Sequence, residues 1–320
     1  MYVPDFELHE AATLDDAGAL LRRHAPAVRL LAGGTDLLVD LKTGRANPRH
    51  LVSLRRVADL RGVVETADGL QIRALTTIRQ LMEHVEGKCG LRIADCGLSP
   101  SPRTPFNPQS AIRNPQSVVA LALLDATRQM AAPQVRNLAT VGGNIASAVP
   151  CADLPPILIA LNASVVLWSP RGERAVPLDQ FFTGPRQTVR RDDEVLTAVL
   201  VPNPPPRFGA AYARFALRDG NAIAVSAVAA SLLLNVDGTI RDARIVLGAV
   251  APVSLPAHDA AKLLVNAPPS DESFQRAATA AMAAAQPISD VRGSAEFRRE
   301  LVGVLTKRSL QSARERASGR

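Results

Sequence analysis

Apolar positions near the start of the chain change between helical and strand-like spacing. A capping-box pattern at Thr13 and Asp16 predicts the start of a helix. The runs Val28–Leu31 and Leu51–Leu54 are short, apolar and typical of buried strands. Four apolar residues share one face of the predicted helix: Leu14, Ala17, Leu20 and Leu21. This region is therefore expected to pack one helix against a small sheet.

The middle of the chain repeats this alternation. Leu70–Ala74 predicts a strand, and Thr77 is placed to cap the helix that follows it. The apolar run Val118–Met130 predicts a second helix, and Ser164–Trp168, rich in β-branched residues, predicts another strand. The helix after Thr77 turns these apolar residues inward: Ile78, Leu81, Met82 and Val85.

Beyond a proline-rich linker at 202–206 the pattern changes. Ala222–Leu234 and Ile240–Leu247 predict two strands, joined at a hairpin turn by Asp237-Gly238. Two helices are expected next, at Ser273–Ala285 and from Ser294 to about Leu310. The apolar face of the last helix is expected to comprise Phe297, Leu301, Val304 and Leu305. Two strands followed by two helices predict a separate small α+β domain.

One segment, Ser99–Ser117, interrupts this organisation. It contains five prolines and the direct repeat Asn-Pro-Gln-Ser at 107–110 and 114–117. Such proline density opposes regular structure, so we expect a mobile surface insertion, which is favoured over a peptide-docking role.

The 320-residue chain carries a formal net charge of +7, with basic residues gathered near its end at Lys307, Arg308, Arg314, Arg316 and Arg320. A nucleic-acid surface is disfavoured because aromatic residues are only 3% of the chain and base-stacking side chains are scarce. A solvated face, or a face for an acidic partner subunit, is the favoured interpretation. We expect no membrane span and no secretory signal, since the apolar runs are short and the first residues lack a signal pattern.

Cysteines and histidines give no metal-ligand spacing. Three cysteines, Cys89, Cys96 and Cys151, cannot supply the four thiolates of an ordinary iron–sulfur site. They are interpreted as reduced thiols in a cytoplasmic protein. The five histidines are dispersed along the sequence and are expected to be surface or loop residues, so no metal is predicted: His9, His24, His50, His84 and His258.

Two glycine pairs carry the candidate chemistry. They lie in the segments Leu31–Asp36 (LAGGTD) and Thr140–Asn144 (TVGGN). Glycine lacks Cβ, so backbone N–H groups in such loops can approach anionic oxygens closely, and two such loops suggest a pyrophosphate. Either pair alone is also typical of a tight turn. Neither fits the Rossmann or P-loop motif.

Five ordered segments resemble the FAD-binding (medium) subunit of molybdenum hydroxylases, the family of carbon monoxide dehydrogenase, xanthine dehydrogenase and 4-hydroxybenzoyl-CoA reductase. The matching segments are 32–38 (AGGTDLL), 74–78 (ALTTI), 134–144 (QVRNLATVGGN), 153–156 (DLPP) and 287–294 (PISDVRGS). Two features depart from the family: Arg73 stands where glycine is usual, and the proline-rich insertion has no recognised counterpart. The cysteine-rich insertion of the 4-hydroxybenzoyl-CoA reductase subunit is absent, which disfavours that branch.

The resemblance implies an α+β fold: a two-subdomain FAD-binding module of the vanillyl-alcohol-oxidase/PCMH type, followed by a small α+β C-terminal domain. We expect FAD-binding subdomain 1 at 1–55 and subdomain 2 at 56–201, with the insertion at 99–117. A linker at 202–206, the C-terminal domain at 207–312 and a basic tail at 313–320 complete the chain.

The resemblance also implies the cofactor contacts. Backbone N–H groups of the first loop are expected to face the FAD pyrophosphate, and the second loop to approach from the other side. Asp153 is expected to accept hydrogen bonds from ribityl or ribose hydroxyls, with a helix N-cap as its alternative. Helix capping is an equal alternative for Thr76 and Thr77. The expected cofactor-binding residues are Ala32, Gly33, Gly34, Thr35, Asp36, Thr76, Thr77, Thr140, Gly142, Gly143, Asn144 and Asp153.

By resemblance, the chain is the FAD-carrying, electron-transfer subunit of a heteromeric molybdenum hydroxylase. A [2Fe-2S] centre and molybdopterin are then expected on an iron–sulfur small subunit and a molybdopterin large subunit, in a dimer of heterotrimers. Electrons would leave to NAD, a quinone or another acceptor, and no acid–base catalytic residue is needed. The alternatives are a self-contained FAD oxidoreductase and a module of the same fold that has lost FAD.

Overall fold

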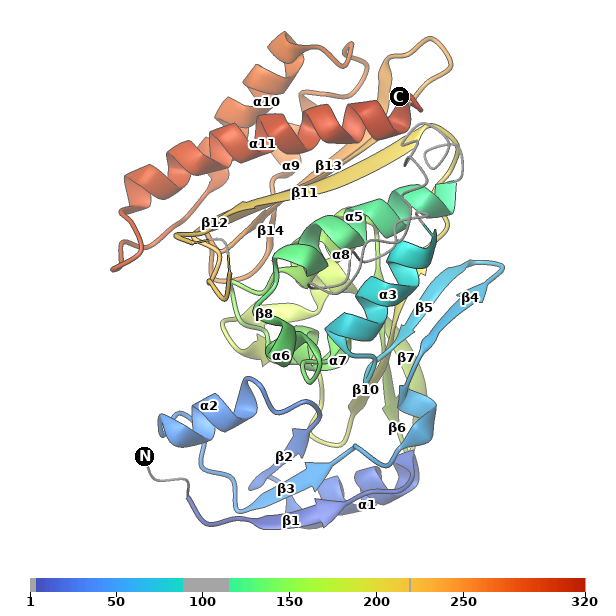
Figure 1. Ribbon diagram of the computed structural model, residues 1–320, viewed down its shortest axis with the longest axis vertical. Helices are drawn as coiled ribbons and strands as arrows, with labels where there is room; N and C mark the ends of the chain where they lie inside the picture. Colours follow the sequence, from blue (N-terminus) through green and yellow to red (C-terminus); the bar gives the residue numbers. More distant parts are fainter. Residues whose placement is uncertain (1–3, 89–114, 219, 320) are drawn as a thin grey trace, which may run out of the picture. The chain divides into compact units, whose positions relative to one another are not determined.

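The computed structural model describes residues 4–88, 115–218 and 220–319 (Figure 1). The chain divides into two compact units. Unit 1 comprises 1–81, 131–152 and 162–202, and unit 2 comprises 82–130, 153–161 and 203–320. Each predicted domain is one continuous stretch of the sequence, whereas these two units interleave along it. The predicted domain boundaries stay predictions.

Unit 1 is built mainly of strands. Its helices are α1 (Leu14–His24), α2 (Leu37–Lys42), α6 (Pro133–Arg136) and α7 (Val141–Ala146), with short 3₁₀ turns η1 (Ala58–Leu60) and η2 (Leu178–Gln180). Its strands are β1 (Glu7–Glu10), β2 (Val28–Leu31), β3 (His50–Ser53), β4 (Val63–Thr66), β5 (Gly69–Arg73), β6 (Ser164–Ser169), β7 (Gly172–Pro177), β8 (Phe182–Gly184), β9 (Gln187–Thr188) and β10 (Val195–Pro202).

Two principal sheets form unit 1. The parallel sheet has the order β1-β3-β2, and the antiparallel sheet has the order β4-β5-β10-β6-β7. In the parallel sheet, His50 at the start of β3 pairs with both Glu7 of β1 and Val28 of β2. The first glycine pair, Gly33-Gly34, follows the carboxyl end of β2 after one residue, Ala32.

The capping box at Thr13 is confirmed: the Thr13 hydroxyl accepts from the Asp16 N–H at 3.1 Å, and the Asp16 carboxylate accepts from the Thr13 N–H at 3.0 Å. Burial of Ala17 and Leu21 agrees with the predicted helix face. Gly18 of α1 permits close packing, since a Cβ there would lie 3.1 Å from the Trp168 ring. Helix α1 and the parallel sheet therefore share one hydrophobic core.

Unit 2 combines one sheet with helices on both faces. The strands are β11 (Phe208–Phe215), β12 (Ser226–Leu234), β13 (Ile240–Gly248) and β14 (Leu255–Pro256), in that order across the sheet. The helices are α3 (Ile78–Lys88), whose first residues belong to unit 1, α5 (Pro115–Gln129), α8 (Leu154–Ala160), α9 (His258–Lys262), α10 (Asp271–Ala284) and α11 (Ala295–Ala317).

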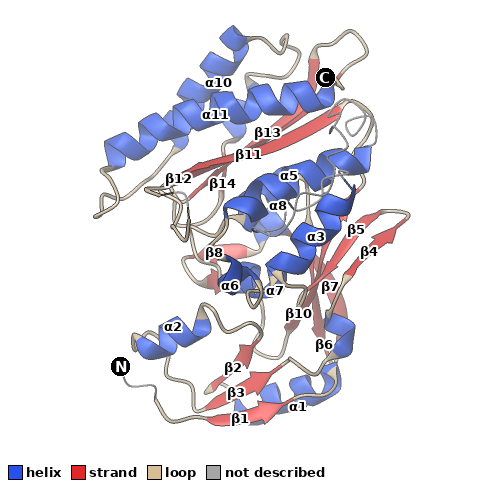
Figure 2. Cartoon of the chain, viewed as in Figure 1, coloured by secondary structure: helices blue, strands red, loops and turns tan. Residues whose placement is uncertain are grey.

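Alternate residues of β12 contact different helices. Val228 and Leu232 belong to one core with Phe274 of α10 and Val302 of α11. On the other side, the Ser231 hydroxyl donates to the Ala160 carbonyl of α8 at 2.9 Å. Figure 2 shows this sheet between its helices. A sheet with two buried faces needs cover on both sides, and the helices of unit 2 provide it. The mixture of strands and helices confirms the expected α+β class.

Three expectations for unit 2 are corrected. Strand β11 was not predicted, since its run Gly209-Ala210-Ala211 has small side chains and weak strand preference. Within α11, Phe297 and Val304 are 42% and 46% exposed, so the predicted apolar face is wrong at these positions. The helix also extends beyond its expected end near Leu310, to Ala317.

The buried face of α11 instead includes polar residues: Arg298, Thr306 and Ser309. The Arg298 guanidinium donates to the Asp290 carboxylate at 2.6 Å, and to the Val225 and Ala249 carbonyls. Near the C-terminus, Arg316 donates to both carboxylate oxygens of Asp125. Part of the basic cluster is therefore used within unit 2.

The proline-rich segment lies mostly outside the described residues. Only its last residues are placed, and there the expected irregular structure is wrong, because α5 begins at Pro115. Proline is favoured in the first helical turn, where an N–H has no helical acceptor. Over residues 4–88, 115–218 and 220–319, none of the helices combines the length and the apolar character that a membrane span needs.

Candidate functional site

The first glycine pair forms the turn between β2 and α2. Gly34 has φ +76°, a backbone conformation that favours glycine. Its carbonyl accepts from the Leu38 N–H at 2.9 Å. Among the hydrogen bonds of the described residues, none is donated by the N–H groups of Gly33, Gly34, Thr35 or Asp36. Residues 33–35 are half-buried and Asp36 is exposed, so a loop of this kind can offer its N–H groups to an anionic ligand.

The second glycine pair forms the first turn of α7, and its N–H groups are used within the protein. Val141 donates to the Thr76 carbonyl, and Gly142 to the Ala74 carbonyl, both at 2.9 Å. Gly143 donates to the Thr140 hydroxyl at 3.1 Å, which caps the helix. Asn144 donates to the Thr140 carbonyl at 2.9 Å. This turn is thus fixed against the segment that leads into α3.

Close backbone approach joins the two pairs. A Cβ on Gly33 would overlap the carbonyl group of Leu138, with its carbon 2.8 Å away. A Cβ on Gly142 would lie 2.6 Å from the Ala74 side chain, and one on Gly143 would lie 3.9 Å from Ala32 Cβ. Three segments distant in the sequence, 32–36, 74–78 and 138–144, therefore meet in unit 1.

One polar atom at this meeting point has no protein partner. The Oδ1 atom of Asn144 is buried and accepts no hydrogen bond from the described residues. An unsatisfied buried acceptor costs on the order of 1–3 kcal/mol. A ligand that donates a hydroxyl or N–H hydrogen bond there would offset that cost.

Two family descriptions match most of the chain. Residues 4–204 match "FAD binding domain in molybdopterin dehydrogenase", and residues 210–313 match "CO dehydrogenase flavoprotein C-terminal domain". The chain belongs to this family of FAD-binding subunits. Both the suspected family and the predicted fold class are confirmed.

Named relatives cover nearly the whole chain. It is 32% identical over 314 residues to the carbon monoxide dehydrogenase medium chain of Hydrogenophaga pseudoflava, covering 98% of each. It is also 32% identical to a xanthine dehydrogenase FAD-binding subunit of Escherichia coli, covering 98% of this chain and 97% of that one. A solved carbon monoxide dehydrogenase from H. pseudoflava matches with a TM-score of 0.84, 32% identity and 99% coverage of both chains.

The residues of unit 1 fit the cofactor that the family binds. FAD carries a pyrophosphate, which needs hydrogen-bond donors, and the loop 33–36 presents N–H groups that the protein leaves free. FAD also carries hydroxyl and ring N–H donors, which suit the unpartnered Asn144 oxygen. The donor set and the orphaned acceptor are thus complementary to one dinucleotide.

Most predicted site residues lie in this cluster, but two hydroxyls are already engaged. Thr76 is buried and donates to the Gly62 carbonyl at 2.8 Å. Thr77 caps α3: its hydroxyl accepts from the Gln80 N–H at 3.1 Å, and the Gln80 side chain accepts from the Thr77 N–H. Capping, the alternative for Thr77, is thereby observed.

Asp153 belongs to unit 2 and is held by protein groups. The Tyr212 hydroxyl donates to its carboxylate at 2.6 Å, and Arg214 Nη1 donates to both oxygens at 3.0 Å. Burial raises the pKa of Asp153, and Arg214 and Tyr212 oppose that rise. Asp153 stands at the N-cap position of α8, as the alternative predicts, although its side chain makes no capping hydrogen bond.

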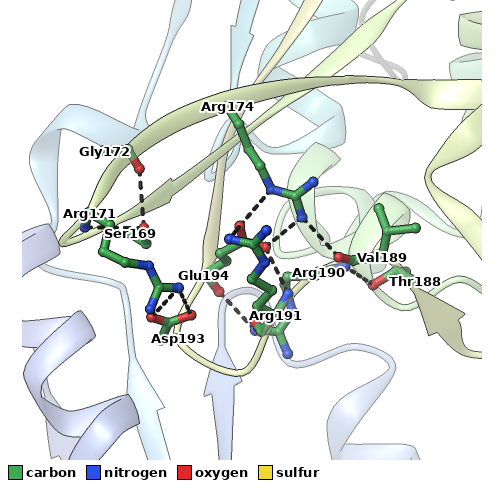
Figure 3. A network of polar contacts seen from close by, with 10 residues as sticks. All are labelled: Ser169, Arg171, Gly172, Arg174, Thr188, Val189, Arg190, Arg191, Asp193 and Glu194. Atoms are coloured by element: carbon green, nitrogen blue, oxygen red, sulfur yellow. Dashed lines mark hydrogen bonds and ion pairs between the residues drawn. The ribbon is translucent and has the colours of Figure 1, made fainter.

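A polar network before β10 was missed from the sequence (Figure 3). Arg174 donates to both oxygens of Glu194, at 2.7 and 2.9 Å, and to the Val189 carbonyl. The hydrogen bond from Arg174 lowers the pKa of Glu194. Arg190 donates to the Glu194 carbonyl at 2.8 Å, and burial lowers the pKa of Arg190. The mixed charges of 190–194 were a signal for such pairing, but they did not identify Arg174 as the partner.

Proposed function

We propose that the chain binds FAD through the free N–H groups of the loop 33–36 and serves as the electron-transfer subunit of a molybdenum-dependent dehydrogenase. The observation that carries the proposal is the set of unpartnered loop donors beside the buried Asn144 oxygen. Bound FAD would supply the redox chemistry, taking electrons from a partner [2Fe-2S] centre and delivering them to NAD, a quinone or another acceptor.

The chain's own residues supply position and electrostatics. Ala32 and the loop 33–36 hold the pyrophosphate with dipoles that oppose its charge. Thr140, Gly142 and Gly143 hold the second turn against Ala74, which fixes the place of Asn144. Asn144 then accepts a hydrogen bond from the cofactor. The hydroxyls of Thr76 and Thr77 are used within the protein, by the Gly62 carbonyl and the Gln80 N–H, and so stabilise the segment 74–78 instead of binding the cofactor.

Asp153 has a different place in the proposal. Its carboxylate already accepts hydrogen bonds from Tyr212 and Arg214 within unit 2. The main role of Asp153 in this proposal is therefore to stabilise unit 2. A hydrogen bond from a ribose or ribityl hydroxyl to its carboxylate would be additional. Removing a partner from a buried ion pair costs about 3–5 kcal/mol, so Asp153→Ala should affect folding as well as cofactor retention.

The names of the relatives support the proposal of partner subunits. The solved carbon monoxide dehydrogenase from H. pseudoflava is described as lacking the Mo-pyranopterin moiety of its molybdenum cofactor, and a similar polypeptide of the same organism is named a carbon monoxide dehydrogenase medium chain. We propose that this chain likewise joins an iron–sulfur small subunit and a molybdopterin large subunit, as a dimer of heterotrimers in the cytoplasm.

The test has two parts. Purified full-length chain should carry one FAD, identified after its release by denaturation. The native complex, isolated through this chain, should contain a [2Fe-2S] subunit and a molybdopterin subunit. A colourless folded chain that cannot be loaded with FAD would contradict the cofactor assignment, whereas a flavin-loaded chain that purifies alone would contradict the subunit role.

A further inference from the structure

Three histidines that the sequence separates lie together in unit 1. His9 comes from β1, His24 from the last turn of α1, and His50 from the first position of β3. Their ring centroids lie 4.7 Å apart for His9 and His24, 5.3 Å for His9 and His50, and 3.9 Å for His24 and His50. The expectation that these histidines are dispersed is therefore wrong in space.

The cluster follows from the strand register. Glu7 and His9 are two residues apart on β1 and point to one face of the sheet. His50 pairs with Glu7 across β1 and β3, and α1 packs beside β3. Figure 1 shows these three elements side by side. The end of α1 thus adds a third imidazole to a pair that the sheet already forms.

The nitrogen positions suit a small divalent cation. His9 Nε2 and His50 Nδ1 are 3.2 Å apart, and one ring nitrogen from each of the three histidines lies within 4.8 Å of the others. Two nitrogens bound tetrahedrally to Zn²⁺ at about 2.0–2.1 Å are roughly 3.3–3.4 Å apart. The pair His9–His50 therefore already has nearly the required separation, and the most distant pair would close by no more than about 1.5 Å on binding.

A carboxylate completes the donor set. The Glu7 oxygens lie 3.8 Å from His9 Nε2 and 3.5 Å from His50 Nδ1. The Glu7 side chain is 65% exposed, so it can move without disturbing the core. Imidazole nitrogens and carboxylate oxygens are both ligands that Zn²⁺ takes in four-coordinate sites.

We propose that His9, His24 and His50, with Glu7 as a fourth ligand, form a Zn²⁺ site. The ion would tie β1 and β3 to the end of α1. This site is separate from the proposed FAD loop: His50 and Val28 begin β3 and β2, whereas the glycine pair follows the last residue of β2. Its failure would therefore leave the FAD proposal intact.

Calorimetric titration of tag-free, full-length chain with Zn²⁺ tests the site. Wild-type protein should bind one equivalent, and His24→Gln should weaken that binding about 100-fold by removing a ligand. The matched control is His258→Gln, an exposed histidine of α9, which should bind Zn²⁺ like the wild type. Circular dichroism and FAD content of His24→Gln should match the wild type, which separates ligand loss from misfolding.

Substitution with Co²⁺ gives a second readout, because a tetrahedral site produces intense visible absorption. The proposal predicts that absorption in the wild type and the His258→Gln control, its loss in His24→Gln, and a weaker, altered spectrum in Glu7→Gln. It is overturned if a folded wild-type chain takes up no Zn²⁺, or if His24→Gln binds Zn²⁺ as tightly as the wild type.

Discussion

The two glycine pairs lie in the same unit, but they use their backbones differently. In the first pair, the N–H groups of 33–36 have no acceptor among the described residues. In the second, the N–H groups of Val141, Gly142, Gly143 and Asn144 all donate to protein oxygens. The first loop is therefore free to bind a ligand, and the second is a structural support that also places Asn144.

This difference changes why glycine is needed. The sequence suggests that both pairs keep space open for a phosphate. Around Gly33 and Gly142, that space is instead filled by the Leu138 carbonyl and by Ala74. If a bulky variant at either position lost FAD, the first explanation would thus be disturbed packing of the protein, not the loss of a direct contact with the cofactor.

The largest expected effect comes from Gly142→Val. Its Cβ would lie 2.6 Å from Ala74 Cβ and 2.8 Å from the Ala74 carbonyl oxygen, so backbone must move. We expect a loss of about 3 kcal/mol in the free energy of unfolding, or insoluble protein. Urea unfolding measures it, with Gly87→Ala as the control, because a Cβ on Gly87 meets nothing within 4 Å. Wild-type stability for Gly142→Val would refute the supporting role.

Asn144→Ala separates cofactor binding from folding. Removing the unpartnered Oδ1 acceptor should leave the stability of the FAD-free chain unchanged or slightly raised. FAD affinity should fall by roughly tenfold, equivalent to about 1.4 kcal/mol. Fluorescence titration with FAD and thermal unfolding of the free chain would measure the two effects. A parallel loss of both would mean that Asn144 supports the fold only.

Thr140→Ala should have the smallest effect. It removes the hydroxyl that accepts from the Gly143 N–H and caps α7. Capping residues contribute about 1 kcal/mol, so the free energy of unfolding should fall by about that amount, while Thr140→Ser should retain most of it. If Thr140→Ser were as unstable as Thr140→Ala, packing of the methyl group would explain the loss better than the cap.

Elements with simple periodicity were predictable from the sequence. The capped helix α1, strands β2 and β3, and the β12–β13 hairpin follow local rules of capping, alternation and turn chemistry. Strand β11 does not follow these local rules. Its Gly209 leaves room for the Ala313 backbone of α11, a contact between distant parts of the sequence. The buried Arg298 likewise depends on carbonyls and a carboxylate brought from elsewhere in unit 2.

The candidate site was predictable in its location but not in its working parts. Resemblance identified the segments that meet in unit 1. Whether a glycine makes room for a ligand or for another backbone depends on contacts such as Gly33 with Leu138, which the sequence does not specify. The histidine cluster was missed for a similar reason: its spacing of 9, 24 and 50 has meaning only in the strand register.

Hydrogen exchange at individual backbone amides tests the central claim most directly. Full-length chain would be compared with and without FAD, since exchange reports whether each N–H is hydrogen-bonded. We predict that the amides of 33–36 exchange rapidly without FAD and become protected when it binds, whereas those of 141–144 are protected in both states. Equal exchange at 33–36 in the two states would contradict the account, as would FAD-dependent protection confined to 141–144.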